Sequence, residues 1–443
     1  MHSRPARHAT LASLALGLAA LLAAGPARAQ VEIQWWHSMT GALGERVTEI
    51  ANGFNSSQST YKIVPIYKGS YPESMTAAIA AYRAGNPPHI VQVFEVGTAT
   101  MMAAQGAIKP VYQLMKDAGL QFNPKAYLPA VAGYYTDRKG NMLSMPFNSS
   151  TPVFYVNEDA FKKAGLDPKA PTTWKEFAIA AGKLKASGQA CVYTTGWPAW
   201  VHIENFSAWH NLPIGTLENG IGGLKTEFKI NSPAHVAHVQ MLADFAKNGW
   251  FTYAGRKNEA EAKFFSGECA MLTSSSGAQA NIRKNAKFAF SVNMLPYHDE
   301  IAGAPQNSII GGASLWVMGK KKADEYKGVA TFFNYLSNTD LQVRWHEMTG
   351  YVPITVAAYE AAKKSGYYEK VPGADIAVRQ LNFKPPTANS KGLRFGSYVQ
   401  GREIIEEEME AVFAGKKTAQ AGLDEATRRG NELLRRFEAT AKE

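Results

Sequence analysis

The sequence predicts an α/β protein that is divided into two lobes. From residue 31 onward, strand-like and helix-like segments alternate as β-α-β-α-β-α, the pattern of a mostly parallel sheet covered by helices. The chain has 443 residues, of which 46% are hydrophobic and 19% are charged, a composition typical of globular proteins. Because one hydrophobic core seldom serves more than about 250–300 residues, we expect two lobes.

The first 29 residues predict a secretory signal peptide. Arg4 and Arg7 precede an apolar run over residues 11–25, and Ala27-Arg28-Ala29 has the small residues of a cleavage site. The apolar run is shorter than the roughly 18 residues that would suggest a membrane-spanning helix. We therefore expect cleavage before Gln30 and export of the mature chain.

Hydrophobic periodicity predicts the elements of the first part of the chain. Residues 31–37, 61–69 and 89–97 are strand-like, whereas residues 43–54 and 74–85 are helical and a further helix begins near Thr98. Ligands of such sheets bind beyond the carboxyl ends of the strands. The residues that follow these strands are therefore candidate site positions: Trp36-His37-Ser38, Gly69-Ser70-Tyr71 and Glu95-Val96-Gly97.

A second set of elements begins near Phe147. Strands are expected at 151–157, 191–197, 269–277, 288–296 and 310–318, and a loop is expected after 197. Helices are expected at 173–188, 232–248, 259–266, 324–337 and 340–349, from 278, and in a long tail from about 402; the first of these starts with a capping box, Thr173 and Glu176. Because no linker separates the halves, we expect strands that cross between the lobes and a cleft between them.

Composition and motifs exclude several classes of function. The formal net charge is +10, but the basic residues are scattered, which argues against nucleic acid as a partner. "HEMTG" (346–350) lacks the second histidine of a zinc protease, and the sequence has no GxSxG, GxxxxGK[ST] or GxGxxG motif. We therefore predict no catalytic residue, metal or cofactor. Cys191 and Cys269 are either a disulfide or two free thiols.

Polar and aromatic groups at the ends of elements are the remaining candidates. The hydroxyls of "FNSST" (147–151) and "LTSSSGAQANIRK" (272–284) either contact a ligand or form ordinary turns. Gly311-Gly312 either allows close backbone approach or forms a bulge. Trp174, Trp209 and Trp316 are predicted in the core, whereas Trp197 and Trp200 follow a strand and are candidates for an aromatic wall.

Several segments spread over the mature chain resemble one family. "WHSMTGALGE", "YKIVPIYKGSY", "VFEVGTATMMAA", "PFNSSTPVFYVN", "IIGGASLWVM" and "TGYVPIT" are similar to the periplasmic glycerol-3-phosphate receptors of ABC importers, which are extracellular solute-binding proteins related to maltose-binding protein. The resemblance implies a type II periplasmic-binding-protein fold, whose hinged lobes close on a ligand in the cleft. We expect residues 30–146 and about 297–350 in the N-terminal lobe, and residues 147–296 and about 351–443 in the C-terminal lobe.

The same resemblance implies a set of ligand contacts. They are Tyr71, Glu95, Ser150, Trp197, Trp200, Ser275, Gly312, Tyr351 and Arg402. Two positions stay open, because Arg394 rivals Arg402 for the phosphate charge, and Ser274 or Ser276 could replace Ser275.

The chemistry of this set suits a phosphorylated glycerol. Hydroxyls and one guanidinium donate to phosphate, the Glu95 carboxylate accepts from glycerol hydroxyls, and the two tryptophans cover the carbon skeleton or a choline group. We expect a monomeric periplasmic receptor that delivers glycerol 3-phosphate or glycerophosphodiesters such as glycerophosphocholine to an inner-membrane permease. The alternatives are an exported glycerophosphodiester hydrolase using His37 and Glu95, or an oligosaccharide receptor of the same fold. Arg402→Ala is expected to abolish binding with little effect on thermal stability.

Overall fold

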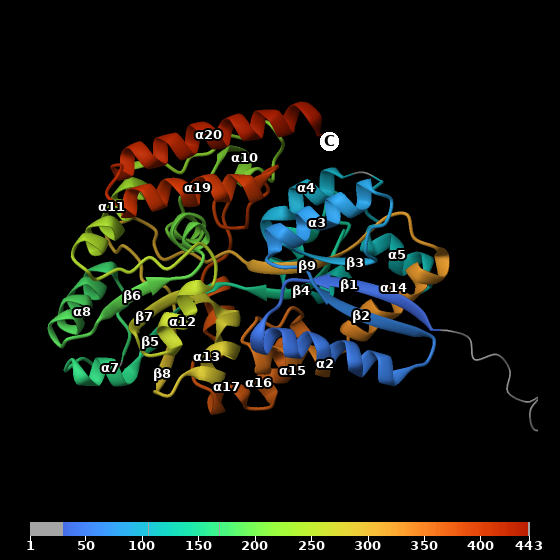
Figure 1. Cartoon of the computed structure of the whole chain (residues 1–443), viewed down its shortest axis with the longest axis horizontal. Coiled ribbons are helices and arrows are strands. Elements are labelled where there is room, and N and C mark those ends of the chain that lie inside the picture. Colours follow the sequence, from blue (N-terminus) through green and yellow to red (C-terminus); the bar gives the residue numbers. More distant parts are fainter. Residues whose placement is uncertain (1–29, 105, 168, 442–443) are drawn as a thin grey trace, which may run out of the picture.

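Two β-sheets organise the chain. The computed structural model describes residues 30–104, 106–167 and 169–441, so the predicted signal peptide lies outside the described residues. One sheet is five-stranded, in the order β2-β1-β3-β9-β4, and the other is four-stranded, in the order β6-β7-β5-β8. In Figure 1 the first sheet lies on the right and the second on the left, with helices packed around both. The predicted α/β fold with two sheets is confirmed.

The five-stranded sheet contains both parallel and antiparallel pairs. Its strands are β1 (Val31–His37), β2 (Tyr61–Tyr67), β3 (Ile90–Phe94), β4 (Met145–Ser150) and β9 (Gly311–Val317). β1 pairs in parallel with β2 and β3, as predicted. β9 pairs antiparallel with β3 and β4, because it enters from the other sheet and not through a helical crossover. The periodicity did not predict β4.

The helices of this part of the chain include those predicted at 43–54, 74–85, from Thr98, 324–337 and 340–349, whereas the helices between residues 111 and 135 were not predicted. They are α2 (Gly41–Ser57), α3 (Tyr71–Arg83), η1 (Glu95–Gly97), α4 (Thr98–Ala103), α5 (Val111–Asp117), η2 (Pro124–Ala126), α6 (Pro129–Tyr135), α14 (Ala323–Leu336) and α15 (Thr339–Thr349). α2 buries Val47, Ile50, Ala51 and Phe54, the apolar positions of its predicted face. Ser70 and Glu73 form a capping box at the start of α3, which fixes Tyr71 as its first residue.

The four-stranded sheet has its own helices. Its strands are β5 (Pro152–Asn157), β6 (Cys191–Thr195), β7 (Cys269–Ser275) and β8 (Phe290–Asn293). The helices from residue 158 to 285 are α7 (Glu158–Lys163), α8 (Trp174–Ala186), η3 (Trp200–Asn205), α9 (Phe206–Trp209), α10 (Thr216–Asn219), α11 (Pro233–Lys247), α12 (Glu259–Phe265), η4 (Ser276–Ala278) and α13 (Gln279–Asn285). The capping box of α8 is formed as predicted.

The end of the chain is a set of separate helices. These are α16 (Val356–Lys364), α17 (Tyr367–Lys370), α18 (Ile376–Leu381), α19 (Tyr398–Phe413) and α20 (Ala419–Thr440). The predicted long tail from residue 402 is therefore wrong in detail, because Gly415, with φ 70°, lies in the turn that separates α19 from α20. The two helices lie side by side across the upper left of Figure 1. None of the helices in the described part of the chain is both long enough and apolar enough to cross a membrane.

The chain crosses between the sheets twice, at Thr151 between β4 and β5 and again between β8 and β9. The two crossing segments contact each other, since the Thr151 hydroxyl donates to Ser308 Oγ at 2.6 Å. The finer lobe boundaries near residues 146, 297 and 350 stay a prediction.

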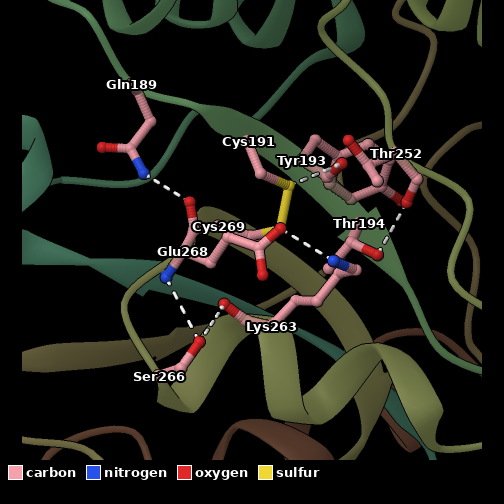
Figure 2. Close-up of a disulfide and its surroundings, with 9 residues drawn as sticks. All are labelled: Gln189, Cys191, Tyr193, Thr194, Thr252, Lys263, Ser266, Glu268 and Cys269. Carbon is pink, nitrogen blue, oxygen red and sulfur yellow. Dashed lines mark hydrogen bonds and ion pairs between the residues drawn. A yellow bond between two sulfur atoms is a disulfide. The ribbon is translucent and has the colours of Figure 1, made fainter.

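A disulfide joins the two cysteines whose state the sequence left open. Cys191 and Cys269 are register partners at the starts of the parallel strands β6 and β7 (Figure 2). Both residues are buried, as are the predicted core tryptophans Trp174, Trp209 and Trp316. The bond fixes the starts of two strands whose opposite ends lead to Trp197 and Ser275.

Candidate functional site

One cavity collects every predicted ligand contact. It has a volume of about 140 Å³ and is lined by residues that follow strands of both sheets. The predicted residues in its wall are Tyr71, Glu95, Ser150, Trp197, Trp200, Ser275, Gly312, Tyr351 and Arg402. Because these residues come together from positions throughout the chain, this cavity is the candidate binding site. Each individual ligand contact stays a prediction.

Arg402 lies at the centre of a buried ion cluster. Its Nε donates to Glu204 Oε1 at 2.8 Å, and its Nη2 donates to Glu204 Oε2 at 2.7 Å and to Glu95 Oε1 at 2.6 Å. Glu95 follows β3 and Glu204 lies in η3 after β6, so one guanidinium connects residues that follow strands of both sheets. Among the described residues, Nη1 has no hydrogen-bond partner, which leaves it available to a ligand.

The charges of this cluster depend on one another. Burial lowers the pKa of Arg402, but Glu204 and Glu95 raise it well above its usual range, so the cation persists. Burial raises the pKa of Glu95, although Arg402 opposes this effect. One guanidinium thus faces two buried carboxyl groups. The expectation that Arg402 can be removed with little effect on thermal stability is untested, but the buried ion pairs argue against it, because loss of Arg402 would leave two buried carboxylates unpaired.

The segment with the tryptophans is helical, contrary to the predicted loop. Residues 200–205 form the π-helix η3, an uncommon element that often occurs at functional sites. Trp197 precedes it with φ 54°, a strained conformation for a bulky residue, and its N–H donates to the Lys257 carbonyl at 2.9 Å. The Ala199 N–H donates to Glu406 Oε1 of α19 at 2.9 Å. This segment thus positions Trp197, Trp200 and Glu204 together.

A hydrogen-bond chain orients the Tyr71 hydroxyl. The Ser38 N–H donates to Gln92 Oε1, Gln92 Nε2 donates to Asn148 Oδ1, and Asn148 Nδ2 donates to the Tyr71 oxygen, at 2.8, 2.7 and 2.9 Å. Burial, followed by the nearby Tyr351, raises the pKa of Tyr71 well above its usual range. Its oxygen accepts from Asn148, and its hydroxyl also interacts with that of Tyr351, so these two phenols lie together in the cavity wall.

The two glycines of β9 have separate steric roles. A Cβ on Gly311 would lie 2.3 Å from Trp200 Cζ2, so this glycine makes room for the indole. A Cβ on Gly312 would lie 1.8 Å from the Asn148 carbonyl oxygen, and Gly312 has φ 89°. The pairing of β4 and β9 also shifts register between Pro146 and Asn148. A local irregularity is therefore present, and the glycines allow close approach of Trp200 and of the Asn148 backbone, whereas close approach to a ligand stays a prediction.

The serine run has a defined register. Ser275 lines the cavity and its Oγ accepts from the Gly277 N–H at 3.1 Å. Ser274 Oγ instead donates to Glu261 Oε1 at 3.0 Å, and the Ser276 side chain is buried. These positions favour Ser275 over its two neighbours as the ligand contact.

Arg394, the rival for the phosphate charge, has another role. Its Nη2 donates to the carbonyl oxygens of Gly133, Tyr134 and Thr136 at 3.1, 3.1 and 2.9 Å. The guanidinium therefore ties the segment before α19 to α6. This geometry favours Arg402, which lines the cavity.

Several residues of the cavity wall were not predicted from the sequence. They include Lys257, Asn258, Glu261 and Asn281. Lys257 Nζ donates to Ser70 Oγ at 3.2 Å, and Asn281 Oδ1 accepts from the Ala42 N–H at 3.2 Å. Lys257 and Asn258 precede α12 and Glu261 lies in its first turn, where the sequence predicted only a helix over residues 259–266.

The residues suggested for a hydrolase are not arranged as a catalytic pair. His37 Nδ1 accepts from the Met39 N–H at 3.3 Å, and burial lowers the pKa of His37 to about 4. Glu95 is bonded to Arg402 instead. Within the described ranges, no group of three or more His, Cys, Asp or Glu residues is placed to hold a metal ion.

Comparison with known proteins identifies the family. Residues 49–372 match the bacterial extracellular solute-binding protein family. The chain is also 54% identical over 437 residues, 98% of both chains, to the sn-glycerol-3-phosphate-binding periplasmic protein UgpB of Pectobacterium atrosepticum. The chain belongs to the bacterial extracellular solute-binding protein family. Members of this family bind solutes, and this chain is accordingly not an enzyme.

Two solved structures have the same fold. UgpB from Mycobacterium tuberculosis, in complex with glycerophosphocholine, superposes with a TM-score of 0.76 at 22% identity and covers 91% of this chain and 98% of its own. Maltose-bound MalE3 of T. maritima superposes with a TM-score of 0.73 at 17% identity and covers 91% of this chain and 100% of its own. At these identities the likeness shows the fold alone.

Proposed function

We propose that this chain is the periplasmic receptor of an ABC importer and binds sn-glycerol 3-phosphate and glycerophosphodiesters such as glycerophosphocholine. The observation that carries the proposal is the chemistry of the cavity wall. Hydroxyl donors, from Tyr71, Ser150, Ser275 and Tyr351, surround a single guanidinium whose Nη1 is unpaired among the described residues. Such donors suit a phosphate ester.

The aromatic residues support a ligand with a carbon skeleton. The ring centroids of Trp197 and Tyr71 lie 6.4 Å apart, and Tyr71 is stacked on Phe94 with 5.2 Å between the ring centroids. The wall therefore has a continuous aromatic surface. Such a surface covers glycerol carbons and attracts a quaternary ammonium group. The proposed ligand orientation therefore places the phosphate near Arg402 and a choline group against Trp197.

The relatives support the ligand and the compartment. The curated relative that matches almost the whole chain is named a periplasmic sn-glycerol-3-phosphate-binding protein, and the superposed UgpB structure contains glycerophosphocholine. Delivery of the ligand, by a monomer, to a permease in the inner membrane completes the proposal.

Isothermal titration of the ligand-stripped mature protein tests the proposal. We expect saturable binding of glycerol 3-phosphate and glycerophosphocholine, and no response to maltose. Saturation by maltose alone would support an oligosaccharide receptor. Incubation with glycerophosphocholine and measurement of free choline addresses the hydrolase, because turnover above a control without protein would contradict a receptor.

A further inference from the structure

Glu261 is a cavity residue to which the proposed ligand orientation gives no role. It lies in α12, lines the cavity, and is 5% exposed. Its Oε1 accepts from Ser274 Oγ at 3.0 Å, whereas its Oε2 has no hydrogen-bond partner within the described part of the chain. The unpaired oxygen of this mostly buried carboxyl group is available to a polar group of a ligand in the cavity.

The cations of the cavity are engaged elsewhere. Lys257 Nζ donates to Ser70 Oγ and its charge acts on Glu73, whereas Arg402 binds Glu95 and Glu204. An ionised Glu261 would therefore add a negative charge to the cavity wall, beside a guanidinium that already faces two carboxylates. An anionic ligand would bind poorly to such a wall.

The groups packed around Glu261 act on its charge in both directions. Its own helix contributes Glu259, β7 contributes Ser274, and β5 contributes Tyr155; Tyr351 approaches from the loop after α15. On α13, the guanidinium of Arg283 donates to Gln279 Oε1 and to the Glu347 carbonyl oxygen. Burial, with a contribution from the charge of Glu259, raises the pKa of Glu261 to about 7, although the Ser274 hydrogen bond opposes the rise.

We propose that Glu261 contacts the ligand in its neutral form, with the Oε2 hydroxyl donating a hydrogen bond to a phosphate oxygen. The inference rests on the proposed function, and it means that ligand binding is coupled to the protonation of Glu261. Where Glu261 is ionised in the free protein, binding takes one proton from solvent onto Oε2. A neutral carboxyl group donates to phosphate, whereas a carboxylate can only accept and also repels it.

This coupling determines the direction of the pH dependence. Below a pH of about 7 Glu261 is already neutral, so binding takes up no proton and the affinity is highest. Above that pH, binding must protonate Glu261, so the affinity falls with pH, and the fall approaches about tenfold per pH unit. Glycerophosphocholine is the appropriate probe, because its phosphodiester has no second ionisation in this range.

The test is isothermal titration with glycerophosphocholine between about pH 6 and pH 8.5 in buffers of different ionisation enthalpy. For the wild-type protein we expect no proton uptake at the acid end and uptake of close to one proton per ligand at the alkaline end. Glu406, whose pKa burial raises to about 8, titrates in the same range, so the wild-type profile alone does not assign the proton.

The Glu261→Gln variant makes that assignment, because the amide keeps a donor but cannot ionise. We expect it to bind with nearly constant affinity and without proton uptake across the range. Glu259→Gln is the matched control on the same helix. It is expected to keep the proton uptake of the wild-type protein, with the onset moved to a lower pH, because the charge of Glu259 contributes to the raised pKa of Glu261. Thermal unfolding checks that both variants are folded.

Three outcomes are distinguishable. Unchanged pH dependence in Glu261→Gln, or no proton uptake by the wild-type protein, overturns the role of Glu261. Loss of binding by Glu261→Gln at every pH, with a flat wild-type profile, also overturns it, because the carboxylate then accepts from the ligand. Absence of any phosphate-ester binding by the wild-type protein contradicts the proposed function itself.

Discussion

Replacement of Arg402 by alanine should destabilise the protein as well as abolish binding. The side chains of Glu204 and Glu95, its partners, are 0% and 3% exposed, so neither carboxylate is solvated after the guanidinium is removed. Breaking a buried pair in this way costs about 3–5 kcal/mol. For lobes of about 200 residues, each kcal/mol lowers Tm by about 2–4 °C, so we expect a loss of about 6–20 °C.

The assay is differential scanning calorimetry of the ligand-free protein, combined with titration of glycerol 3-phosphate. The double variant Arg402→Ala/Glu204→Gln should regain part of the lost stability, because one of the unpaired charges is removed, but it should not regain binding. Arg394→Ala is the control. It removes hydrogen bonds to three backbone carbonyls without leaving a buried charge, so it should lower Tm less and still bind the ligand.

The reasoning is refuted if Arg402→Ala unfolds within about 2 °C of the wild-type protein, or if the added Glu204→Gln substitution lowers Tm further. Unchanged affinity in Arg402→Ala would instead move the phosphate contact to another cation, of which Lys257 is the one in the cavity wall.

Three further predictions concern the cavity and its support. Trp197→Ala should weaken the binding of glycerophosphocholine more than that of glycerol 3-phosphate, by about 1–2 kcal/mol or about 5- to 30-fold in Kd, because the indole contacts the choline group in the proposed orientation. Equal losses of affinity for the two ligands in titration would contradict this role. Gly312→Ala should lower both Tm and ligand affinity, because the added Cβ would meet the Asn148 carbonyl oxygen. Gly303→Ala is the control, since Gly303 has a similar φ of 90° but a Cβ there would meet no atom within 4 Å, and this variant should keep its ligand affinity. An equal loss of affinity in the two variants would rule out the steric explanation. Joint replacement of Cys191 and Cys269 by alanine should cost about 4 kcal/mol in chemical denaturation, since the bond closes a sequence separation of 78 residues, and a loss below about 1 kcal/mol would contradict its structural role.

Local sequence patterns predicted most of the elements and much of the cavity wall. Periodicity placed β1 at residues 31–37 without error, because alternating burial and a following helix leave a clear signal. The resemblance supplied the predicted contacts, and all of these side chains lie in one cavity. Elements without such a signal were missed: β4 is buried along its whole length and contains two serines, and η3 follows no helical period of 3.6 residues.

The interactions of the site could not be predicted from local patterns. Arg402 is 198 residues from Glu204 and 307 residues from Glu95 along the chain, so only the fold reveals that their charges are shared. The disulfide was left open for the same reason, because the sequence does not show that β6 and β7 are neighbours. Glu261 was overlooked because an acidic residue in the first turn of a helix is commonplace.

The crystal structure of the protein with glycerophosphocholine tests the central claim most directly. We predict the ligand in the cavity, with a phosphate oxygen within hydrogen-bond distance of Arg402 Nη1 and of the Ser150 and Ser275 hydroxyls, and with the choline group against Trp197. A ligand bound outside this cavity, or a phosphate that contacts Lys257 and not Arg402, would contradict the account.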